Sequence, residues 1–540
     1  MAGFKRMNRV LLGSVACMAL ASCDGSDSVA SPGEGVVVVP APAPAPSPTP
    51  SPSPTASPTP TGGPAASCPT GTTDVGVLAA TYRSCRLPSL ITNALSLPRV
   101  QGVAYEINGR VDVGVDRGAA GNTGTEASLT IAPGAVLYAN TTNADNDFLV
   151  VNRGSRLVAD GTEALPIIFT AQQNLTGGVT EDSQGLWGGV IMAGRAPISN
   201  CLASGAAGGT NQCENVVEGT TTALYGGDLA TDNSGVVRYV QIRYSGTIIS
   251  PNNELQGLTL AGTGSGTVID RVQVHNSSDD GIEIFGGRTN LRYLAITGAD
   301  DDGLDTDVGW QGFAQFVLAI QRPNNNTSDN YSTEIDSNNA EDALPRQRYN
   351  LANFTFVSTS TATNAAIRLR GGADARFVNG LVTGPTACLN IVAGATSDTD
   401  KSTIRPANAA LQDNGPPVFN SVLFNCQTPY ATTTITNNNV SITVTVDEQR
   451  AVFTTGASTG NQEAAGAIVT NGFQPTGAAT SATAFNAATL NPSGSAFFVQ
   501  TSFVGAVNGA NDTAFQRWTC NSNRANFGAN SANCTAAPTT

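Results

Sequence analysis

The feature that most constrains the fold is a short repeat between residues 237 and 320. An apolar pair recurs at spacings of 32, 22 and 22 in four alternating segments, Tyr239-Val240-Gln241-Ile242, Arg271-Val272-Gln273-Val274, Tyr293-Leu294-Ala295-Ile296 and Gln315-Phe316-Val317-Leu318. Such alternation is typical of a strand with one face turned inward. A unit this short cannot bury its inner face alone, so the repeats must stack on one another.

A second strand series shows that each repeat holds more than one strand. It comprises Gly257-Leu258-Thr259-Leu260, Gly281-Ile282-Glu283-Ile284 and Gly303-Leu304-Asp305-Thr306, at spacings of 24 and 22, and it returns as Ala366-Ile367-Arg368-Leu369 and Cys388-Leu389-Asn390-Ile391. Weaker segments extend the array at 129–131, 148–150, 167–169, 187–191 and 422–424. We therefore expect an all-β solenoid whose coils pair in parallel. Leucine-rich repeats are disfavoured because leucine does not recur at their spacing and no segment has a helical pattern.

Changes in composition along the chain divide it into five parts. We expect a signal peptide at 1–22, a lipidated and proline-rich stalk at 23–67, an N-terminal cap with the first strands at 68–128, the parallel β-helix at 129–430, and C-terminal β-rich coils, a cap and a tail at 431–540. Three segments rich in Gly, Asn, Ser and Pro fit no coil, and we expect them to project as loops, at 199–215, 322–348 and 395–416.

The N-terminus has the pattern of an export signal. Lys5, Arg6 and Arg9 precede an apolar run, Val10–Leu20, that is too short to span a bilayer. The tetrad that follows, Leu-Ala-Ser-Cys ending at Cys23, resembles the lipobox of bacterial lipoproteins. The resemblance implies that Cys23 is diacylated after cleavage, which would attach the protein to a membrane through lipid.

The residues after Cys23 bear on where the protein resides. Asp24 resembles an inner-membrane retention signal of enterobacterial lipoproteins, so an inner membrane facing the periplasm stays open beside the favoured outer membrane or cell surface. From Pro40 to Pro64, proline alternates with alanine, serine and threonine, a composition that predicts an extended, disordered segment. At about 3.1 Å per residue it would lift the body some tens of ångströms above the lipid.

The cysteines of the exported body predict disulfides. Setting aside Cys17 and Cys23, eight remain in sequence-adjacent pairs, Cys68 and Cys85, Cys201 and Cys213, Cys388 and Cys426, and Cys520 and Cys534. An even number in an exported chain indicates a disulfide framework, and we expect these adjacent pairings. A zinc site is disfavoured because the chain has no C-x-x-C and a single histidine.

The charge balance excludes one class of partner. Residues 1–22 carry three of the 27 Lys and Arg and none of the 41 Asp and Glu, so their removal lowers the formal net charge from −14 to −17. Such an acidic body argues against nucleic acid and favours cations or neutral and basic partners.

Three motifs carry a resemblance to a known family. The segments GLWGGVIMAGRAPI, DDGIEIFGG and DDDGLDTDVGW resemble right-handed parallel β-helix proteins of the pectate-lyase-like superfamily, in particular poorly characterised secreted or surface proteins of Gram-negative bacteria. The resemblance covers roughly residues 100–520 and implies a right-handed β-helix. Because that group has no settled activity, it informs the fold far more than the function.

The same resemblance suggests an enzymatic alternative, since enzymes on this fold cut polysaccharides. Lyases of the superfamily use a lysine or arginine base beside calcium, but the exported chain has one lysine, Lys401, in a loop-like stretch. Its hydrolases use grouped aspartates with a G-H-G signature, which is missing here. The single histidine, His275, is predicted on the exposed side of its strand. A catalytic set would therefore combine this histidine with the paired aspartates Asp279, Asp280, Asp301 and Asp302.

The recurrent spacing of 22 also predicts an acidic ladder. It stacks Asp279 on Asp301, Asp280 on Asp302 and Glu283 on Asp305, with coils about 4.8 Å apart. Like charges at this distance repel, and calcium accepts six to eight oxygens in irregular geometry. We expect a calcium site built from Asp279, Asp280, Glu283, Asp301, Asp302, Asp305 and Asp307. The alternative is that these are hydrated turn residues.

Aromatic residues beside the ladder, Phe285, Trp310 and Phe313, have two interpretations. They could stack on sugar rings or, as is more usual, fill the core and its edges. Taken together, the sequence favours a non-catalytic surface or periplasmic module that binds a glycan or an envelope protein. A polysaccharide lyase or hydrolase is the alternative.

Overall fold

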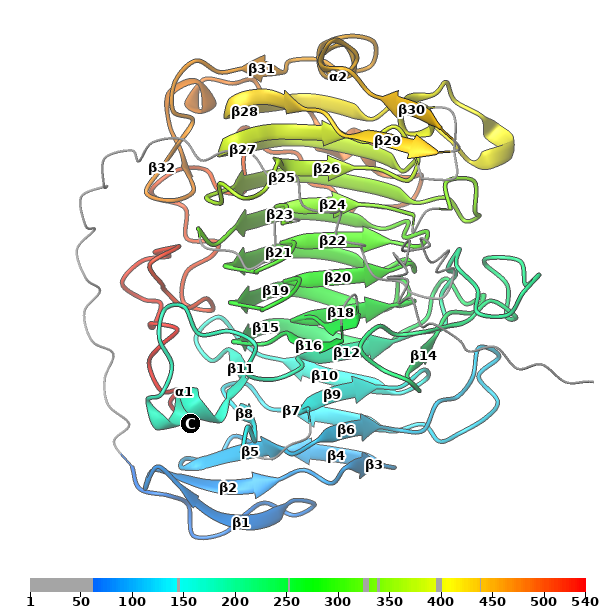
Figure 1. Cartoon of the computed structure of the whole chain (residues 1–540). Coiled ribbons are helices and arrows are strands. Elements are labelled where there is room, and N and C mark those ends of the chain that lie inside the picture. The colour runs from blue at the N-terminus through cyan, green and yellow to red at the C-terminus, as the bar shows by residue number, and fades with distance from the viewer. Residues whose placement is uncertain are drawn as a thin grey trace, which may run out of the picture.

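A computed structural model describes residues 62–142, 146–250, 253–323, 330–337, 340–394, 401–437 and 439–540. Figure 1 shows strands stacked as successive coils from the N-terminal end to the C-terminal end. Twenty-five strands join in one continuous hydrogen-bonded assembly, and neighbouring coils pair in parallel. The predicted right-handed parallel β-helix is confirmed.

Each coil contributes a strand to each of three parallel sheets, which we call sheets 1, 2 and 3 in chain order. Sheet 1 consists of β3 (Leu90–Ile91), β6 (Arg110–Val113), β9 (Phe148–Val151), β12 (Val190–Ala193), β18 (Leu258–Ala261), β20 (Ile282–Phe285), β22 (Leu304–Asp307), β24 (Thr333–Ile335), β26 (Ala365–Leu369) and the ends of β27 (Asp374–Ile391) and β28 (Val418–Ala431).

Sheets 2 and 3 begin as separate strands and later share them. Sheet 2 starts with β4 (Ala94–Leu97), β7 (Ser128–Ile131) and β10 (Arg156–Asp160), and sheet 3 with β2 (Tyr82–Arg86), β5 (Val103–Ile107), β8 (Val136–Ala139) and β11 (Ile167–Ala171). Both then continue in successive parts of β15 (Gly235–Arg243), β19 (Val268–His275), β21 (Asn290–Thr297), β23 (Phe313–Ile320), β25 (Arg348–Val357), β27 and β28. Sheet 3 ends at β31 (Gln462–Glu463).

A single residue in the left-handed region turns each shared strand from sheet 2 into sheet 3. These corner residues lie one per coil and have φ values between 51° and 64°, at Tyr239, Arg271, Tyr293, Phe316, Asn353, Asn379 and Ser421. The strand pairings continue on both sides of each corner residue and skip the residue itself. The corner residues therefore form a column along the outside of the solenoid.

The core follows from the alternation of side chains along each strand. In β20, Ile282 and Ile284 are fully buried in the main hydrophobic cluster, and Leu304 of β22 lies in register with Ile282 on the next coil. Glu283, between the two isoleucines, points to the outer face of sheet 1. Burial of each such apolar side chain contributes about 1.5 to 3 kcal/mol, so the stacked columns hold the coils together.

The ends and insertions of the solenoid contain the remaining elements. β1 (Thr73–Leu78) pairs antiparallel with β2 at the N-terminal end, and α2 (Val446–Thr454) covers the C-terminal end with a capping box from Thr445 and Glu448. A second short helix, α1 (Gln172–Thr176), follows β11. Four antiparallel pairs decorate the coils, β13 (Asn215–Val216) with β14 (Leu224–Tyr225), β16 (Thr247–Ser250) with β17 (Asn253–Leu255), β29 (Thr434–Asn437) with β30 (Val440–Thr443), and β32 (Val469–Thr470) with β33 (Gln474–Pro475).

The C-terminal tail, residues 484–540, runs back along the solenoid toward its first coils (Figure 1). Near the C-terminal end, the Phe485 amide donates to Asn379 Oδ1. At the N-terminal end, the Tyr82 hydroxyl donates to the Pro538 carbonyl at 2.8 Å, and the Gly102 amide donates to Thr540 Oγ1 at 2.7 Å. The tail therefore joins the last coils to the first.

The four predicted disulfides are present, Cys68–Cys85, Cys201–Cys213, Cys388–Cys426 and Cys520–Cys534. Their cysteines are between 12 and 38 positions apart in the sequence, so each disulfide braces a local segment. No helix in the described part of the chain is long and apolar enough to cross a membrane.

Several boundaries differ from the prediction. Parallel pairing begins at β2, well before residue 129, and the segment expected as a loop at 322–348 contains β24, which pairs with β22 and β26. Two short α-helices form where the sequence has no helical pattern. The longer one, α2, depends on its capping box and not on apolar periodicity, and α1 has only five residues. The region 431–540 holds only short strands in its described part, and its tail is extended along other coils.

Candidate functional site

The outer face of sheet 1 carries a column of polar side chains in register. Successive strand pairings align Thr259 with Glu283, Glu283 with Asp305, Asp305 with Glu334, and Glu334 with Arg368. The prediction that Glu283 stacks on Asp305 is confirmed. A second column beside it holds Asp307, Asp336 and Arg370, and Asp280 lies next to Asp302, whose amide donates to it, just before the strands. These residues together form the acidic ladder.

The ladder is covered by other parts of the chain. The relative exposure is 2% for Glu283, 1% for Asp305 and 5% for Asp280. The segment 195–225, braced by Cys201–Cys213, packs its apolar residues on the outer face of sheet 1, where Tyr225 lies 5.9 Å from Phe285 between ring centroids. The alternative of hydrated turn residues is therefore wrong for Asp280, Glu283, Asp302, Asp305 and Asp307, all of which are buried.

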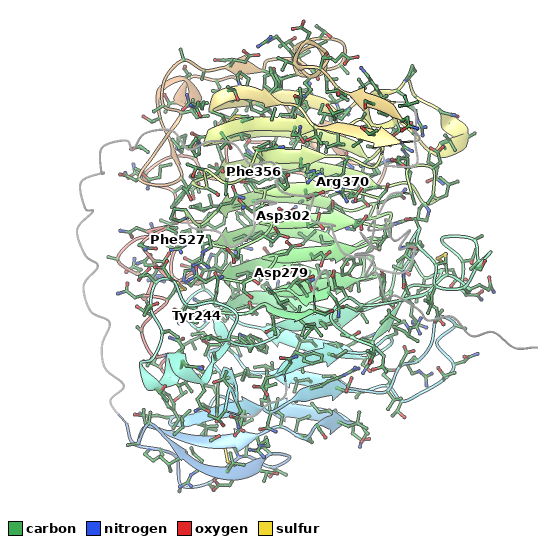
Figure 2. The ribbon with its side chains drawn as sticks, viewed as in Figure 1. Tyr244, Asp279, Asp302, Phe356, Arg370 and Phe527 are labelled. Carbon is green, nitrogen blue, oxygen red and sulfur yellow. A yellow bond between two sulfur atoms is a disulfide. The ribbon has the colours of Figure 1, made fainter. Side chains whose placement is uncertain are left out.

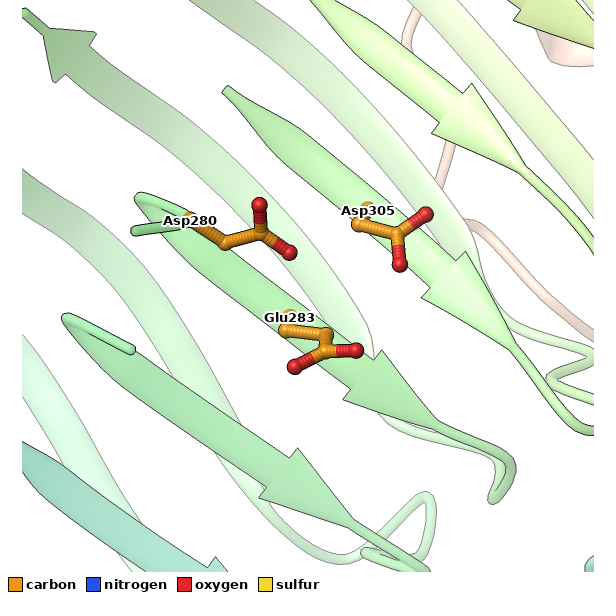
Figure 3. Close-up of side chains that lie close together, drawn as sticks. All are labelled: Asp280, Glu283 and Asp305. Atoms are coloured by element: carbon orange, nitrogen blue, oxygen red, sulfur yellow. The ribbon is translucent and has the colours of Figure 1, made fainter. Parts of the chain in front are cut away.

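Three ladder carboxylates converge on one point. Asp280, Glu283 and Asp305 each place an oxygen within 4.8 Å of the oxygens of the other two (Figure 3). Asp280 Oδ1 accepts from the Asp302 amide at 2.8 Å, and Asp305 Oδ1 accepts from the Thr306 amide at 2.7 Å. Glu283 Oε2 is buried and has no hydrogen-bond partner. The cluster therefore has an acceptor that nothing in the described chain satisfies.

Within the described part of the chain, basic residues pair with the ladder at its far end only. Arg370 Nε lies 3.1 Å from Glu334 Oε1, and the Arg370 guanidinium also pairs with Asp336. Figure 2 shows Arg370 further toward the C-terminal end of the stack than Asp279 and Asp302. Among the described residues, no arginine, lysine or histidine lies within ion-pair distance of Asp280, Glu283 or Asp305. In the described chain, no basic side chain compensates these three carboxylates.

Burial and like charges both raise the pKa of these carboxyls. For Asp280, Glu283 and Asp305, loss of hydration is the larger cause, and neighbouring carboxylates raise the pKa further. The same causes raise the pKa of Asp302 and Asp307. Without a counter-ion the folded protein therefore favours their protonated forms.

The predicted residues Asp279 and Asp301 lie at the half-buried margin of the ladder. Burial and the nearby Glu254 raise the pKa of Asp279 to about 7. The sequence interpretation missed the buried Glu218 and the half-buried Glu254, both of which interact with Asp279. Neither follows the repeat, because they come from segments inserted between coils.

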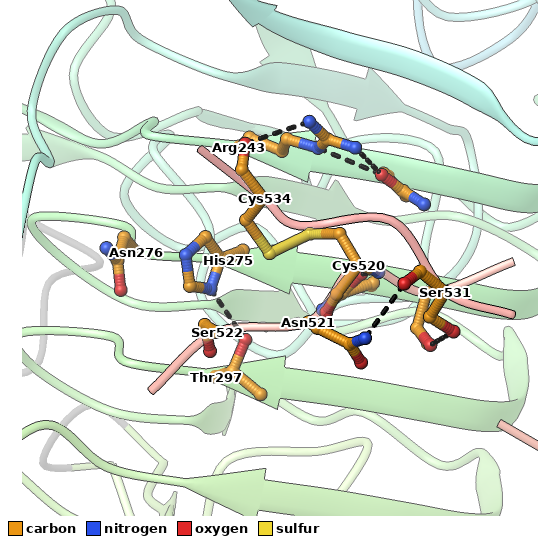
Figure 4. The surroundings of a disulfide bond; sticks show 12 residues. Arg243, His275, Asn276, Thr297, Cys520, Asn521, Ser522, Ser531 and Cys534 are labelled. Carbon is orange, nitrogen blue, oxygen red and sulfur yellow. Dashed lines mark hydrogen bonds between the residues drawn. A yellow bond between two sulfur atoms is a disulfide. The ribbon is translucent and has the colours of Figure 1, made fainter. Parts of the chain in front are cut away.

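The sequence predicts an exposed side chain for His275, and this prediction is wrong. Its side chain is fully buried on the outer face of sheet 3, because the tail and its Cys520–Cys534 disulfide cover this face (Figure 4). Its Nδ1 lies 2.9 Å from Thr297 Oγ1, while Nε2 has no hydrogen-bond partner in the described chain. Burial and three nearby arginines lower its pKa well below 6.5. His275 thus lies on a different sheet from the ladder, and the structure does not unite the proposed catalytic set.

The aromatic residues beside the ladder pack inside the protein. Phe285 and Trp310 are fully buried, and the Trp310 indole donates to the Thr289 carbonyl at 3.1 Å. Phe313 is half-buried and lies 5.3 Å from Phe498 of the tail between ring centroids. The interpretation as core and edge residues is confirmed, and the sugar-stacking alternative is wrong for Phe285 and Trp310. Lys401, the lysine considered as a base, is paired with Glu448 at 2.6 Å.

Comparison with known proteins agrees with this architecture. A family model described as a pectate-lyase-like β-helix domain matches residues 119–469, which is more than half of the chain. The chain belongs to the pectate-lyase-like β-helix family. It matches no curated protein and no solved structure. Family membership is compatible with a binding module and with a polysaccharide-cleaving enzyme, so the function rests on the site.

Proposed function

We propose that this pectate-lyase-like β-helix protein is a non-catalytic binding or structural module of the cell envelope, stabilised by calcium at the acidic ladder. The observation that carries the proposal is the buried cluster of Asp280, Glu283 and Asp305. Among the described residues, its carboxylates face one another without a basic partner, and one of their oxygens has no hydrogen bond. Unpaired buried charge of this kind is costly unless an ion compensates it.

The chemistry of the cluster fits calcium. Calcium binds oxygen ligands at about 2.3 to 2.6 Å, so two ligand oxygens on opposite sides of an ion lie about 5 Å apart. The 4.8 Å limit within the cluster accommodates such an ion. Carboxylates that bind through both oxygens would supply most of the six to eight ligands that calcium takes. The half-buried Asp279 and Asp301 at the margin offer an acidic path from solvent.

Calorimetric titration of the chelator-treated full chain with calcium chloride tests the ion. The parent is expected to bind, and the double variant Glu283→Gln with Asp305→Asn is expected to lose binding. A control with the same chemical changes at exposed positions, Glu163→Gln with Asp447→Asn, should bind as the parent does, because these side chains are 51% and 97% exposed. Equal calcium binding by both double variants would refute the site.

The envelope location rests on the N-terminal sequence, because Cys23 and Asp24 lie outside the described residues. Replacing Cys23 with Ser should remove the acylation site and move the protein from the membrane fraction to the soluble fraction. Metabolic labelling with a fatty acid provides a second readout. A labelled, membrane-bound Cys23→Ser variant would exclude Cys23 as the anchor.

A polysaccharide hydrolase is the second candidate, and one observation favours it. The pKa of Asp279 is raised to about 7, which suits an acid that donates a proton near neutral pH. Burial of His275, Asp280 and Asp302 leaves Asp279 and Asp301 as the half-buried members of the proposed set. Release of reducing ends from polysaccharides by the parent, and its loss in Asp279→Asn, would replace the non-catalytic proposal with this one.

A further inference from the structure

The column of corner residues between sheets 2 and 3 contains a stack of flat side chains. The Arg271 guanidinium lies 5.2 Å from the Tyr239 ring centroid and 4.3 Å from that of Tyr293. Tyr293 in turn stacks on Phe316 with centroids 4.5 Å apart and planes 11° apart. The next corner residue is the much smaller Asn353, and no other ring in the described chain contacts Phe316. The tail packs on Phe316, which is 5% exposed, so Tyr293 is the half-buried ring of the stack beside the tail.

The C-terminal tail encloses the space at the end of this stack. The Asn353 side chain donates to the Phe503 carbonyl at 3.2 Å, which fixes the tail beside the corner. Between them lies a cavity of about 460 Å³ that is open to solvent, and its lining includes Tyr293, Phe316, Phe503, Asn508, Asn511 and Asp512. This volume falls within the usual range for small-ligand sites.

The rim of the cavity is fixed in place but keeps free polar groups. Asp512 accepts from the Asn508 amide at 2.7 Å and from the Ala514 amide at 2.8 Å, so its carboxylate organises the loop. The side chains of Asn508 and Asn511 are exposed and make no hydrogen bond in the described chain. The Tyr293 hydroxyl also lacks a partner there. A ligand therefore meets the half-buried rings of Tyr293 and Phe503, bordered by unpaired donors and acceptors.

The charges at the cavity disfavour an anionic ligand. Arg271 is neutralised by Asp270, whose carboxylate oxygens lie 2.7 and 2.8 Å from Arg271 Nη1. Asp512 is the charged residue of the lining. Sugar rings combine an apolar C–H face, which packs on aromatic rings, with hydroxyls that bond to amides and phenols. We propose that this cavity binds a short neutral oligosaccharide segment of a glycan.

This inference rests on the proposed binding function and gives it a ligand and a site. The cavity is distinct from the acidic ladder, because it lies on the corner between sheets 2 and 3 while the ladder lies on sheet 1 beneath residues 195–225. Sugar binding should therefore persist when calcium is chelated. Sugar binding that persists in chelator would show that the cavity functions independently of the calcium site.

The test begins with the full chain on an array of neutral α- and β-linked oligosaccharides of hexoses, pentoses and N-acetylhexosamines. The best binder is then titrated by calorimetry in chelator. We expect binding in the parent, and affinity about 3- to 12-fold weaker in Tyr293→Phe and in Asn511→Ala, since each loses one hydrogen bond. Asn530→Ala, which changes an exposed tail amide outside the cavity lining, is the matched control and should bind as the parent does.

Two results would overturn the inference. Binding of no neutral oligosaccharide at millimolar concentration would exclude a neutral sugar site. Binding that Tyr293→Phe and Asn511→Ala leave unchanged would place the sugar elsewhere, while the proposed binding function would survive. Loss of calcium binding in the ladder variants, without any change in sugar affinity, would support both proposals independently.

Discussion

The outer faces of sheets 1 and 3 both bury polar side chains, but they satisfy them differently. On sheet 3, Gln273 Nε2 donates to the Cys520 carbonyl at 3.0 Å, and Gln273 Oε1 accepts from the Cys520 amide at 2.6 Å. Gln241 likewise donates to the Trp518 carbonyl at 2.7 Å. On sheet 1, Glu283 faces Asp280 and Asp305, and one of its oxygens has no hydrogen-bond partner among the described residues.

The difference shows what each face requires. An amide carries both a donor and an acceptor, so it can pair with the backbone of an extended segment, and here the tail supplies that backbone. An ionised carboxylate only accepts, and a neighbouring carboxylate cannot satisfy it. The buried glutamines of sheet 3 are therefore satisfied by the tail, whereas the carboxylates of sheet 1 are satisfied best by a cation from outside.

The largest expected effect comes from neutralising the ladder in the absence of calcium. In chelator at pH 7.5, Glu283→Gln with Asp305→Asn should raise the free energy of unfolding by about 2 to 4 kcal/mol, because two buried carboxyls no longer need to be ionised or protonated at a cost. Denaturant unfolding measures this change. The control Glu163→Gln with Asp447→Asn should stay within about 0.5 kcal/mol. A ladder variant less stable than its parent would mean that the carboxylates need no cation.

A smaller loss is expected when the amide pairing of sheet 3 is removed. Gln273→Ala leaves the backbone groups of Cys520 unpaired and should cost about 1 to 3 kcal/mol. Gln273→Glu should destabilise as well, since a carboxylate cannot donate to the Cys520 carbonyl, which is the opposite sign to Glu283→Gln. Hydrogen exchange at the Cys520 amide reports the local effect. The exposed Gln101→Ala is the control, and unchanged protection at Cys520 would contradict the role of the amide.

The comparison also explains which parts of the site were predictable. Glu283 and Asp305 follow the regular period, so their register could be deduced from spacing. Glu334 occupies the next position of the same column, but a longer stretch of chain separates it from Asp305, and this insertion concealed β24. Its Thr-Glu-Ile alternation was the available signal. Arg368 could also have been placed in this column, because it holds the outward position of the predicted strand Ala366-Ile367-Arg368-Leu369.

Other features had no local signal. Tyr225 covers the ladder from a segment between coils, and nothing in its surrounding sequence specifies that contact. His275 is buried by a tail that is distant in the chain, as the sequence separation of 247 between Gln273 and Cys520 illustrates. Periodicity determines contacts between neighbouring coils, but contacts made by inserted and returning segments depend on the three-dimensional path of the chain.

The smallest expected effect is a difference in the pH dependence of the two faces. The pKa of His275 is lowered below 6.5, chiefly by burial, so the folded state favours the neutral ring. Its contribution to stability is present above pH 6.5 and is lost as the pH falls, by up to about 1.4 kcal/mol per pH unit. The pKa of Asp279 is raised from 3.8 to about 7, so its contribution is present below pH 4 and is lost as the pH rises toward 7.

The opposite pH dependences of His275 and Asp279 can be separated by measuring the free energy of unfolding in chelator between pH 5 and 7. Since the chain contains one histidine, His275→Gln should remove the loss of stability on acidification that arises from sheet 3. Asp279→Asn should remove part of the loss on raising the pH that arises from sheet 1. Both variants are compared with the parent at each pH, so the general charge of the protein cancels. If His275→Gln leaves the slope unchanged, the ring binds protons equally in the folded and unfolded states, and burial beneath the tail does not lower its pKa.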